Sequence, residues 1–131
     1  MAKKTIKSCK LLKAVTVNEN DSAVEVAKKL HAFQERRIIV VNKKNVPIGI
    51  ISVLDINDRV VAKGKDIKKT KAKDIMSYPI NLIVNINDSA EEVAKKMIAR
   101  DNYYCPVVEK GILKGLVNYA NIINCLKNGK K

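Results

Sequence analysis

The strongest constraint on the fold is an internal duplication, because one stretch of the sequence occurs twice. Residues 20–29 recur almost unchanged as residues 87–96, and Asp21 matches Asp88 at an offset of 67. The same offset aligns residues 40–41 with 107–108, and an offset of 66 aligns 49–51 with 115–117 after a one-residue deletion. Such self-similarity predicts repeated structural units. We therefore expect two copies of one unit, joined near residues 63–73.

Each copy has the pattern of a strand, a helix, two further strands and a closing helix. Residues 14–17 predict a short strand, and the capping-box pairs Ser22/Glu25 and Ser89/Glu92 predict helix starts. Apolar residues at helical spacing predict the faces that pack on the core. In the first copy these residues are Val26, Ala27, Leu30, Phe33, Leu54, Ile56, Val60 and Val61, and in the second they are Val93, Ala94, Met97, Ile98, Ile122, Ile123 and Leu126.

The remaining strands are indicated by β-branched runs at 38–41 and 105–108, each followed by a turn and a second strand ending at Ser52 or Asn118. The predicted fold class is α+β, with tandem β-α-β-β-α repeats packed sheet to sheet about a pseudo-two-fold axis. The expected boundaries are 8–64 for the first repeat, 65–71 for a linker and 72–126 for the second repeat. One such unit is too small to bury a good core alone, and ligands favour clefts between paired units.

Composition excludes several classes of protein. With 131 residues, 47% of them apolar, the chain is globular, and it has no apolar run near the ~20 residues of a membrane span. The basic N-terminus lacks the apolar stretch of a signal peptide. Cys9, Cys105 and Cys125 are far apart and odd in number, so we expect no disulfide and no zinc site, and a reduced, cytoplasmic location. Cys105 falls in a predicted core strand, where a thiol acts as a small hydrophobe.

Catalysis is poorly supported by the sequence. The single histidine, His31, has no evident nucleophilic partner, and no phosphate-binding loop or metalloprotease motif is present. The net charge of +13 has two interpretations. It could attract nucleic acid, or it could reflect a lysine-rich composition, and the 4% aromatic content gives little support for base stacking.

The segment from Gly49 to Asp55 is the clearest candidate for a binding site, and it also has two interpretations. A short apolar strand stops at Ser52 and turns into a helix, so a hydroxyl and a carboxylate lie three residues apart. A helix N-terminus attracts anions. The same Ser-x-x-Asp pattern is also a capping box that does no more than begin a helix.

With its duplicated β-α-β-β-α pattern, the sequence resembles the CBS domain pair, or Bateman module, of the stand-alone two-CBS type. The resemblance is carried by three segments in the expected order: Gly-x-x-Ser-x-x-Asp at 49–55, Ala72–Ser77, and Tyr104–Val108. It covers about residues 8–126. It implies a regulatory, non-enzymatic module that binds an adenosine nucleotide such as AMP, ADP, ATP or S-adenosylmethionine in the cleft between the repeats. It implies no other cofactor and no metal.

By this resemblance, Asp55 would bind both ribose hydroxyls, Ser52 would face the phosphate, and Ile50, which follows Gly49, would pack near the base. A carboxylate is an acceptor-only group that suits a vicinal diol. Arg36 and Arg37 occupy a position where the family carries phosphate ligands, and arginine suits phosphate. Their alternative role is that of solvated charges at a helix end.

The resemblance also implies that the second repeat supplies the base slot. The matching positions are Ser77, Leu82, Asn102 and Tyr103, for which ordinary packing is the alternative. In the second repeat's own segment, Asn118 and Asn121 replace the hydroxyl and the carboxylate. Asparagine can still cap a helix but is a weaker acceptor for a diol, so we expect one competent site and a weaker second site.

Three kinds of macromolecular partner are expected from the sequence: a second copy of the chain, an effector protein and, in the alternative function, nucleic acid. Family members commonly form homodimers, and a module without an effector domain is expected to act on another protein. The alternative functions are a basic protein that binds nucleic acid, for which the +13 charge is the supporting feature, and a partner subunit whose cleft is empty.

Overall fold

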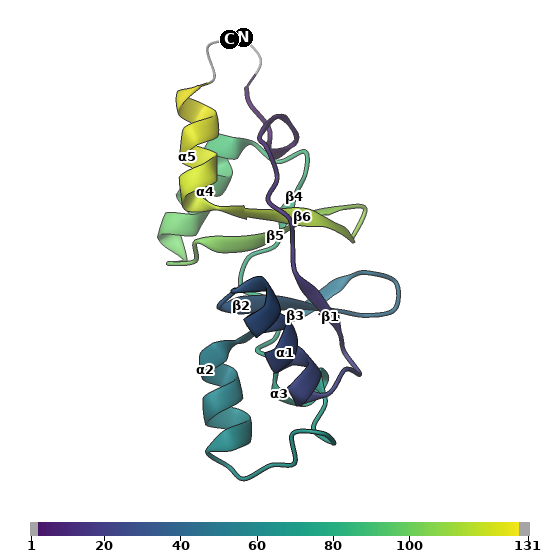
Figure 1. Ribbon diagram of the computed structural model, residues 1–131. Coiled ribbons are helices and arrows are strands. Elements are labelled where there is room, and N and C mark those ends of the chain that lie inside the picture. The colour runs from purple at the N-terminus through teal and green to yellow at the C-terminus, as the bar shows by residue number, and fades with distance from the viewer. Residues whose placement is uncertain (1–2, 129–131) are drawn as a thin grey trace. The chain divides into compact units, whose positions relative to one another are not determined.

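The computed structural model describes residues 3–128, which form two compact units. The first-repeat unit comprises residues 15–80, and the second-repeat unit comprises residues 3–14 together with 81–128. Figure 1 shows a sheet and its helices in each unit. These units differ from the boundaries expected from sequence, because residues 8–14 belong with the second repeat and residues 72–80 with the first.

The first-repeat unit has the predicted β-α-β-β-α order. Its elements are β1 (Thr16–Asn18), α1 (Ala23–Phe33), β2 (Arg37–Val41), β3 (Pro47–Ser52), α2 (Val53–Ile56), the π-helical turn η2 (Asn57–Val61) and α3 (Ala72–Ile75). Strand β2 is central, parallel to β1 and antiparallel to β3, and its register shifts at Val40/Val41.

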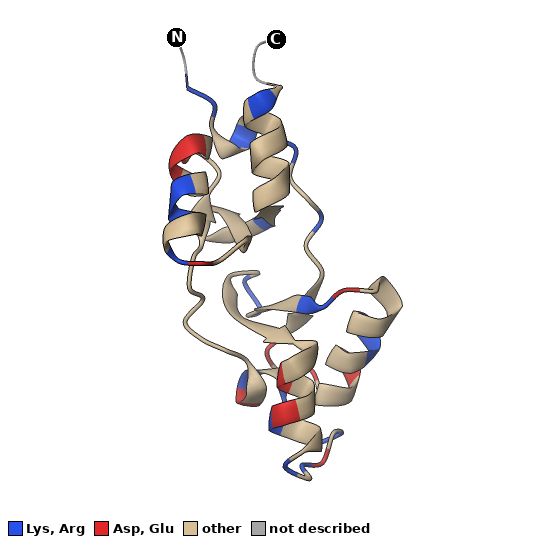
Figure 2. Cartoon of the chain, turned by 90° about the vertical axis from the view of Figure 1, so that its left-hand side faces the viewer, with Lys and Arg blue, Asp and Glu red and all other residues tan. Residues whose placement is uncertain are grey.

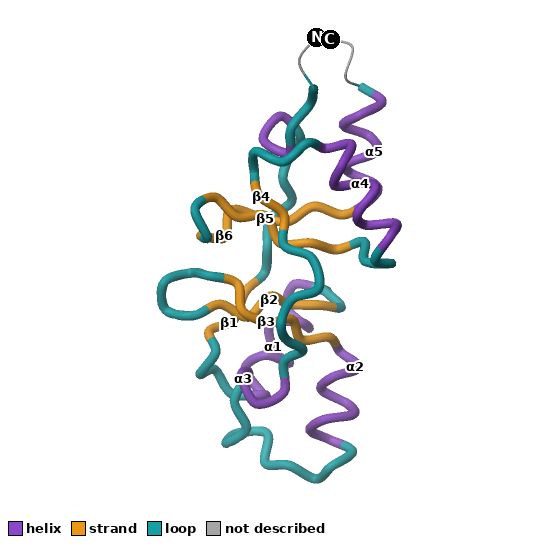
Figure 3. The backbone as a smooth tube through the Cα atoms, turned by 180° about the vertical axis from the view of Figure 1, so that it is seen from behind, coloured by secondary structure: helices purple, strands orange, loops and turns teal. Residues whose placement is uncertain are grey.

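The second-repeat unit has the same topology. Its elements are the 3-10 turn η1 (Ile6–Ser8), β4 (Val84–Asn85), α4 (Ala90–Ala99), β5 (Tyr104–Glu109), β6 (Ile112–Asn118) and α5 (Tyr119–Lys127). Strand β5 is parallel to β4 and antiparallel to β6, with the register shift at Val107/Val108, which matches the first unit at the offset of 67. Helices, strands and loops can be followed in Figure 3. The predicted α+β class is confirmed.

Helix starts follow the sequence signals. Ser22 and Glu25 form the full capping box, in which the Glu25 carboxylate accepts the Ser22 N–H at 3.0 Å. This hydrogen bond is the main cause that lowers the pKa of Glu25. At the second repeat, Ser89 Oγ accepts the Glu92 N–H at 3.3 Å, whereas the Glu92 carboxylate lies 3.6 Å from Lys95 Nζ. The second predicted box is therefore formed only in half.

Each unit packs its helices onto its sheet around a separate core. Most residues predicted to lie on the core faces are at least partly buried, including Val26, Leu30 and Met97. Four residues contradict the prediction: Phe33, Leu54, Val61 and Ile98 have exposures of 53%, 64%, 62% and 57%. Phe33 is the last residue of α1, and Leu54 lies in the first turn of α2. In α4, Met97 is buried against the core, whereas Ile98 lies off this face. Helical spacing alone does not show where a helix runs past its sheet.

Both sheets are completed by a segment from outside the repeat's own strands. Ser77 and Ile50 exchange backbone hydrogen bonds of 2.9 and 3.1 Å, and Leu12 and Leu116 exchange two of 2.9 Å. Ile50 and Leu116 are matched positions of the duplication. Gly49 precedes Ile50 and Gly115 precedes Leu116. Each glycine lies directly against the segment that pairs with its strand. A Cβ at Gly115 would lie 2.8 Å from the backbone oxygen of Leu12.

The expectation that the cysteines would stay unpaired is wrong for two of them. Cys9, directly after η1, forms a disulfide with Cys125 in α5, with their Cα atoms 5.4 Å apart. A separation of 116 residues leaves no local signal in the sequence. Cys105 is a free, fully buried thiol in β5, as predicted, and burial raises its pKa to about 12.

Among residues 3–128, no helix combines the length and apolar character needed to cross a bilayer. Figure 2 shows lysine and arginine distributed over helices and loops of both units. The predicted linker at 65–71 is exposed apart from Thr70, and it lies along the start of α1, where Ala23 N donates to Thr70 O at 2.8 Å.

We expect Gly115→Ala to destabilise the protein by about 1–3 kcal/mol, because a backbone oxygen must move to admit the new methyl group. Gly49→Ala should cost less, because its Cβ would meet the flexible side chain of Met76. Chemical denaturation of both variants checks this order. Equal losses would show that the segment carrying Leu12 adjusts as easily as a methionine side chain.

Candidate functional site

The predicted pair Ser52 and Asp55 lies at the junction of β3 and α2. Asp55 Oδ2 accepts the Ser52 N–H at 2.9 Å, and Ser52 Oγ accepts the Asp55 N–H at 3.1 Å. This is a reciprocal capping box, so the structural interpretation of the motif is confirmed. One side-chain oxygen of each residue accepts the backbone N–H of the other. The capping box therefore fixes both side chains at the start of the helix.

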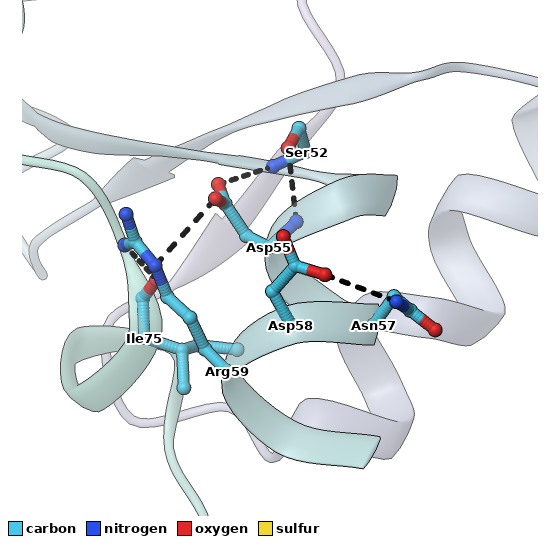
Figure 4. Close-up of polar contacts among 6 residues, drawn as sticks. All are labelled: Ser52, Asp55, Asn57, Asp58, Arg59 and Ile75. Carbon is cyan, nitrogen blue, oxygen red and sulfur yellow. Dashed lines mark hydrogen bonds and ion pairs between the residues drawn. The ribbon is translucent and has the colours of Figure 1, made fainter. Parts of the chain in front are cut away.

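The second oxygen of Asp55 faces a basic side chain (Figure 4). Arg59 Nε lies 3.6 Å from Asp55 Oδ1, a distance too long for a hydrogen bond. The Arg59 side chain is fixed elsewhere, since its Nη1 donates to the Ile75 carbonyl at 2.8 Å. Asp55 Oδ1 therefore keeps lone pairs for a further donor, although the side chain is only 18% exposed.

A cavity of about 780 Å³, here called the arginine cavity, lies beside this helix start, within the first-repeat unit. It is lined by Arg36, Arg37, Ser52, Val53, Leu54 and Asn57. A volume of this size falls in the range of small-molecule pockets. The backbone fixes its rim, because Val53 N donates to the Arg36 carbonyl at 3.0 Å. The structure thus brings the predicted arginine pair and Ser52 together, whereas Asp55 turns toward Arg59 and Ile75.

The other predicted residues divide between the two units. Ile50 and Ser77 are joined by the backbone bridge of the first-repeat unit. The side chain of Met76 lies so close to Gly49 that a Cβ atom at this position would collide with it. Leu82, Asn102 and Tyr103 belong to the second-repeat unit.

Leu82 is 5% exposed and forms part of the second-repeat core. The Asn102 Oδ1 accepts the Tyr104 N–H at 3.4 Å, which is a turn contact. Tyr103 is 44% exposed, and a hydrogen bond with Asp101 raises its pKa. Their roles toward a ligand remain predictions.

The matching position in the second repeat keeps the cap and loses the charge. Asn118 N donates to Asn121 Oδ1 at 2.7 Å, and Asn121 N donates to Asn118 Oδ1 at 2.8 Å. The amide nitrogen of Asn121 donates to the Lys10 carbonyl at 2.8 Å, so both ends of this side chain serve the fold.

The arginine cavity has an aromatic counterpart in the second repeat. Tyr103 stands at the position of Arg36 and packs edge to face against Tyr119, which stands at the position of Val53, with ring centroids 5.7 Å apart. The backbone contact is retained, because Tyr119 N donates to the Tyr103 carbonyl at 3.2 Å. The same backbone therefore carries a basic rim in one copy and an aromatic pair in the other.

Two residues of the site were missed by the sequence interpretation. Asn57 lines the arginine cavity, and Arg59 faces Asp55. The spacing of four residues between Asp55 and Arg59 was an available signal, since oppositely charged side chains at this spacing meet on a helix. Within residues 3–128, no cluster of three or more His, Cys, Asp or Glu side chains could hold a metal ion.

Comparison with known families gives one clear result. The profile described as "CBS domain" matches the chain twice, over residues 10–62 and 72–128. An uncharacterized protein of Methanopyrus kandleri is 33% identical over 110 residues, which is 83% of this chain and 56% of that protein. The chain thus spans little more than half the length of that relative.

Solved structures share the fold at low sequence identity. Hypoxic Response Protein I, solved with two coordinated zinc ions, has a TM-score of 0.78 at 19% identity, covering 92% of this chain and 98% of that one. A hexameric CBS-CP12 protein from bloom-forming cyanobacteria has a TM-score of 0.72 at 22% identity, covering 99% of this chain and 78% of that one.

The capping geometry predicts different effects for two substitutions of Asp55. Asp55→Asn should leave stability nearly unchanged, because Asn121 already plays the same part in the second repeat. Asp55→Ala leaves the Ser52 N–H without its acceptor and should cost about 0.5–1 kcal/mol. Thermal denaturation of the two variants measures the difference, and an equal loss in both would mean that the charge of Asp55 supports the helix more than its hydrogen bond does.

Proposed function

Because the chain belongs to the CBS domain family, we propose that it is a regulatory module that binds an adenosine nucleotide through its first repeat. CBS domain pairs are in general regulatory ligand-binding modules and not catalysts. The observation that carries the proposal is the cavity of about 780 Å³ lined by Arg36, Arg37 and Ser52. A basic rim beside a hydroxyl group favours a phosphate-bearing ligand over a neutral one.

The phosphate end of the ligand would lie in this cavity. Arg36 and Arg37 are both exposed, and their side chains stand at the boundary between the α1–β2 turn and β2. A guanidinium group can bind two phosphate oxygens at once, which a lysine cannot do. Ser52 Oγ and the Asn57 amide would add neutral donors to the same group.

The ribose would lie at Asp55. One carboxylate oxygen is occupied by the Ser52 N–H, and the other meets only a longer contact with Arg59 Nε. A carboxylate held in place by its own helix start loses little side-chain freedom on binding a diol. In the second repeat, Asn121 supplies a neutral amide that already donates to Lys10, and the paired tyrosines Tyr103 and Tyr119 replace the basic rim. We therefore propose that a single strong site is present.

Titration calorimetry with AMP, ADP, ATP and S-adenosylmethionine tests this proposal. We expect at least one of them to bind with a stoichiometry near one per chain. Asp55→Asn should weaken binding about 10- to 100-fold, because a charged acceptor is replaced by a neutral one while the cap is kept. Asn121→Asp is the matched control and should leave the first site unchanged.

Three results would contradict the proposal: none of the four compounds binds, Asp55→Asn binds as the parent does, or two equal sites are found.

The phosphate end is tested with Arg36→Gln, which should weaken the binding of ATP more than it weakens the binding of adenosine. Equal effects on both would place the phosphates outside the arginine cavity.

We also propose that the first-repeat unit binds a second copy of the chain. Phe33, Val53, Leu54 and Val61 are each more than half exposed, and a cavity of about 500 Å³ between α1 and α2 exposes further apolar side chains. These residues belong to α1, α2 and η2 of one unit, and several exposed large apolar side chains in one unit are typical of an interface. Assembly is known in the fold, since the cyanobacterial CBS-CP12 protein is a hexamer.

Light scattering of the purified chain should give about twice 14.6 kDa. Val61→Glu should shift the dimer toward the monomer, because it places a charge among these apolar side chains. Ile98→Glu, at a similarly exposed position of the second-repeat unit, is the matched control and should leave the dimer intact. A monomeric parent, or equal effects of the two variants, would rule out this interface.

A further inference from the structure

The N-terminal segment is attached to the second-repeat unit by one covalent bond and several hydrogen bonds. Ile6 is fully buried, and its N–H donates to the Asp88 carbonyl at 2.9 Å. Leu12 is bridged to Leu116, and the Lys10 carbonyl accepts from Asn121. Between these contacts lies the Cys9–Cys125 disulfide, which joins residues 116 positions apart.

The duplication shows how the first repeat makes the same attachment without a disulfide. There Ser77 bridges to Ile50, and the carbonyl two residues earlier, at Ile75, accepts from Arg59. In the second repeat the carbonyl two residues before Leu12 is that of Lys10, which accepts from Asn121. Cys125 stands at the position of Arg59 at the offset of 66. Because one unit holds its segment by hydrogen bonds and by the buried side chains of Ala72 and Ile75, with no disulfide, the fold itself does not require the covalent bond.

The disulfide lies at the edge of the second-repeat core and borders a cavity, because Cys9 is 5% exposed, whereas Cys125 is only partly buried. A cavity of about 370 Å³ is lined by both cysteines and by Lys4 and Lys10. Lys4 Nζ donates to the Cys125 carbonyl at 3.0 Å, so a positive charge lies at the backbone of this cysteine. Positive charge stabilises a thiolate and makes a cysteine pair more reactive. Cys105 is the opposite case, since it is fully buried and burial raises its pKa to about 12.

We propose that Cys9 and Cys125 are a reversible dithiol–disulfide pair that controls how firmly the N-terminal segment is held on the second-repeat unit. The reductant is a dithiol. One of its thiolates attacks Cys125 Sγ, which forms a mixed disulfide and releases Cys9 as a thiolate. Its second thiolate then attacks the mixed disulfide, which releases Cys125 and closes the reductant's own disulfide. Two electrons and two protons pass to the protein.

Reduction leaves the hydrogen bonds of the segment in place and removes the constraint on its opening. The reduced unit then corresponds to the first-repeat unit, whose segment is held without a disulfide. Local opening becomes more frequent at residues 5–12, because a covalent link no longer returns the segment to its site. The sheet of the first-repeat unit contains neither cysteine and is not affected.

The test uses the full chain with Cys105→Ser, so that every thiol counted belongs to the pair. The protein is equilibrated in mixtures of reduced and oxidised dithiothreitol, alkylated with a maleimide of high mass and analysed by gel shift. Both thiols should appear together, without denaturant. Amide hydrogen exchange at residues 5–12 should rise about tenfold or more on reduction, while exchange in β2 and β3 stays constant.

Cys9→Ser with Cys105→Ser is the matched control, since its exchange should already be fast and should not respond to dithiothreitol. A bond that resists excess reduced dithiothreitol in the folded protein would overturn the proposal. So would a reduction that unfolds the whole chain or leaves exchange at residues 5–12 unchanged, because the disulfide would then be purely structural or without effect on the segment.

Discussion

The structure of each unit depends on the pairing of its edge strand with a segment that comes from outside the repeat's own strands. An unpaired edge strand leaves backbone N–H and C=O groups without partners. The backbone N–H and C=O groups of Ile50 are hydrogen-bonded to those of Ser77 in one unit. Those of Leu116 are hydrogen-bonded to those of Leu12 in the other. Close approach of these segments requires a glycine before each bridging residue, which accounts for Gly49 and Gly115. The repeat visible in the sequence and the unit that folds are therefore not the same set of residues.

The same arrangement places the chemistry of the candidate site. The strand that is paired in this way ends at Ser52 or at Asn118, and the next residues begin a helix through a reciprocal capping box. The box fixes the side chain at its third helical position, which is Asp55 in the first repeat and Asn121 in the second. One scaffold therefore presents a carboxylate near a basic cavity, and its copy presents an amide that is already used to hold Lys10.

Much of this was predicted from the sequence, because the signals involved are local. The duplication fixed the topology, and the Ser-x-x-Asp spacing predicted the capping box that Ser52 and Asp55 form. Predictions failed where the outcome depends on distant residues. Helical spacing placed Phe33 in the core, although α1 ends there and leaves the side chain exposed.

The sequence by itself determined the order of the elements, the helix starts and the difference in charge between Asp55 and Asn121. Those features depend on residues a few positions apart, whose interactions are set by backbone geometry. Tertiary structure alone decided that Arg59 donates to the Ile75 carbonyl and that Cys9 reaches Cys125. Such contacts join positions that become neighbours only after the incoming segments pair with the sheets, so no local pattern encodes them.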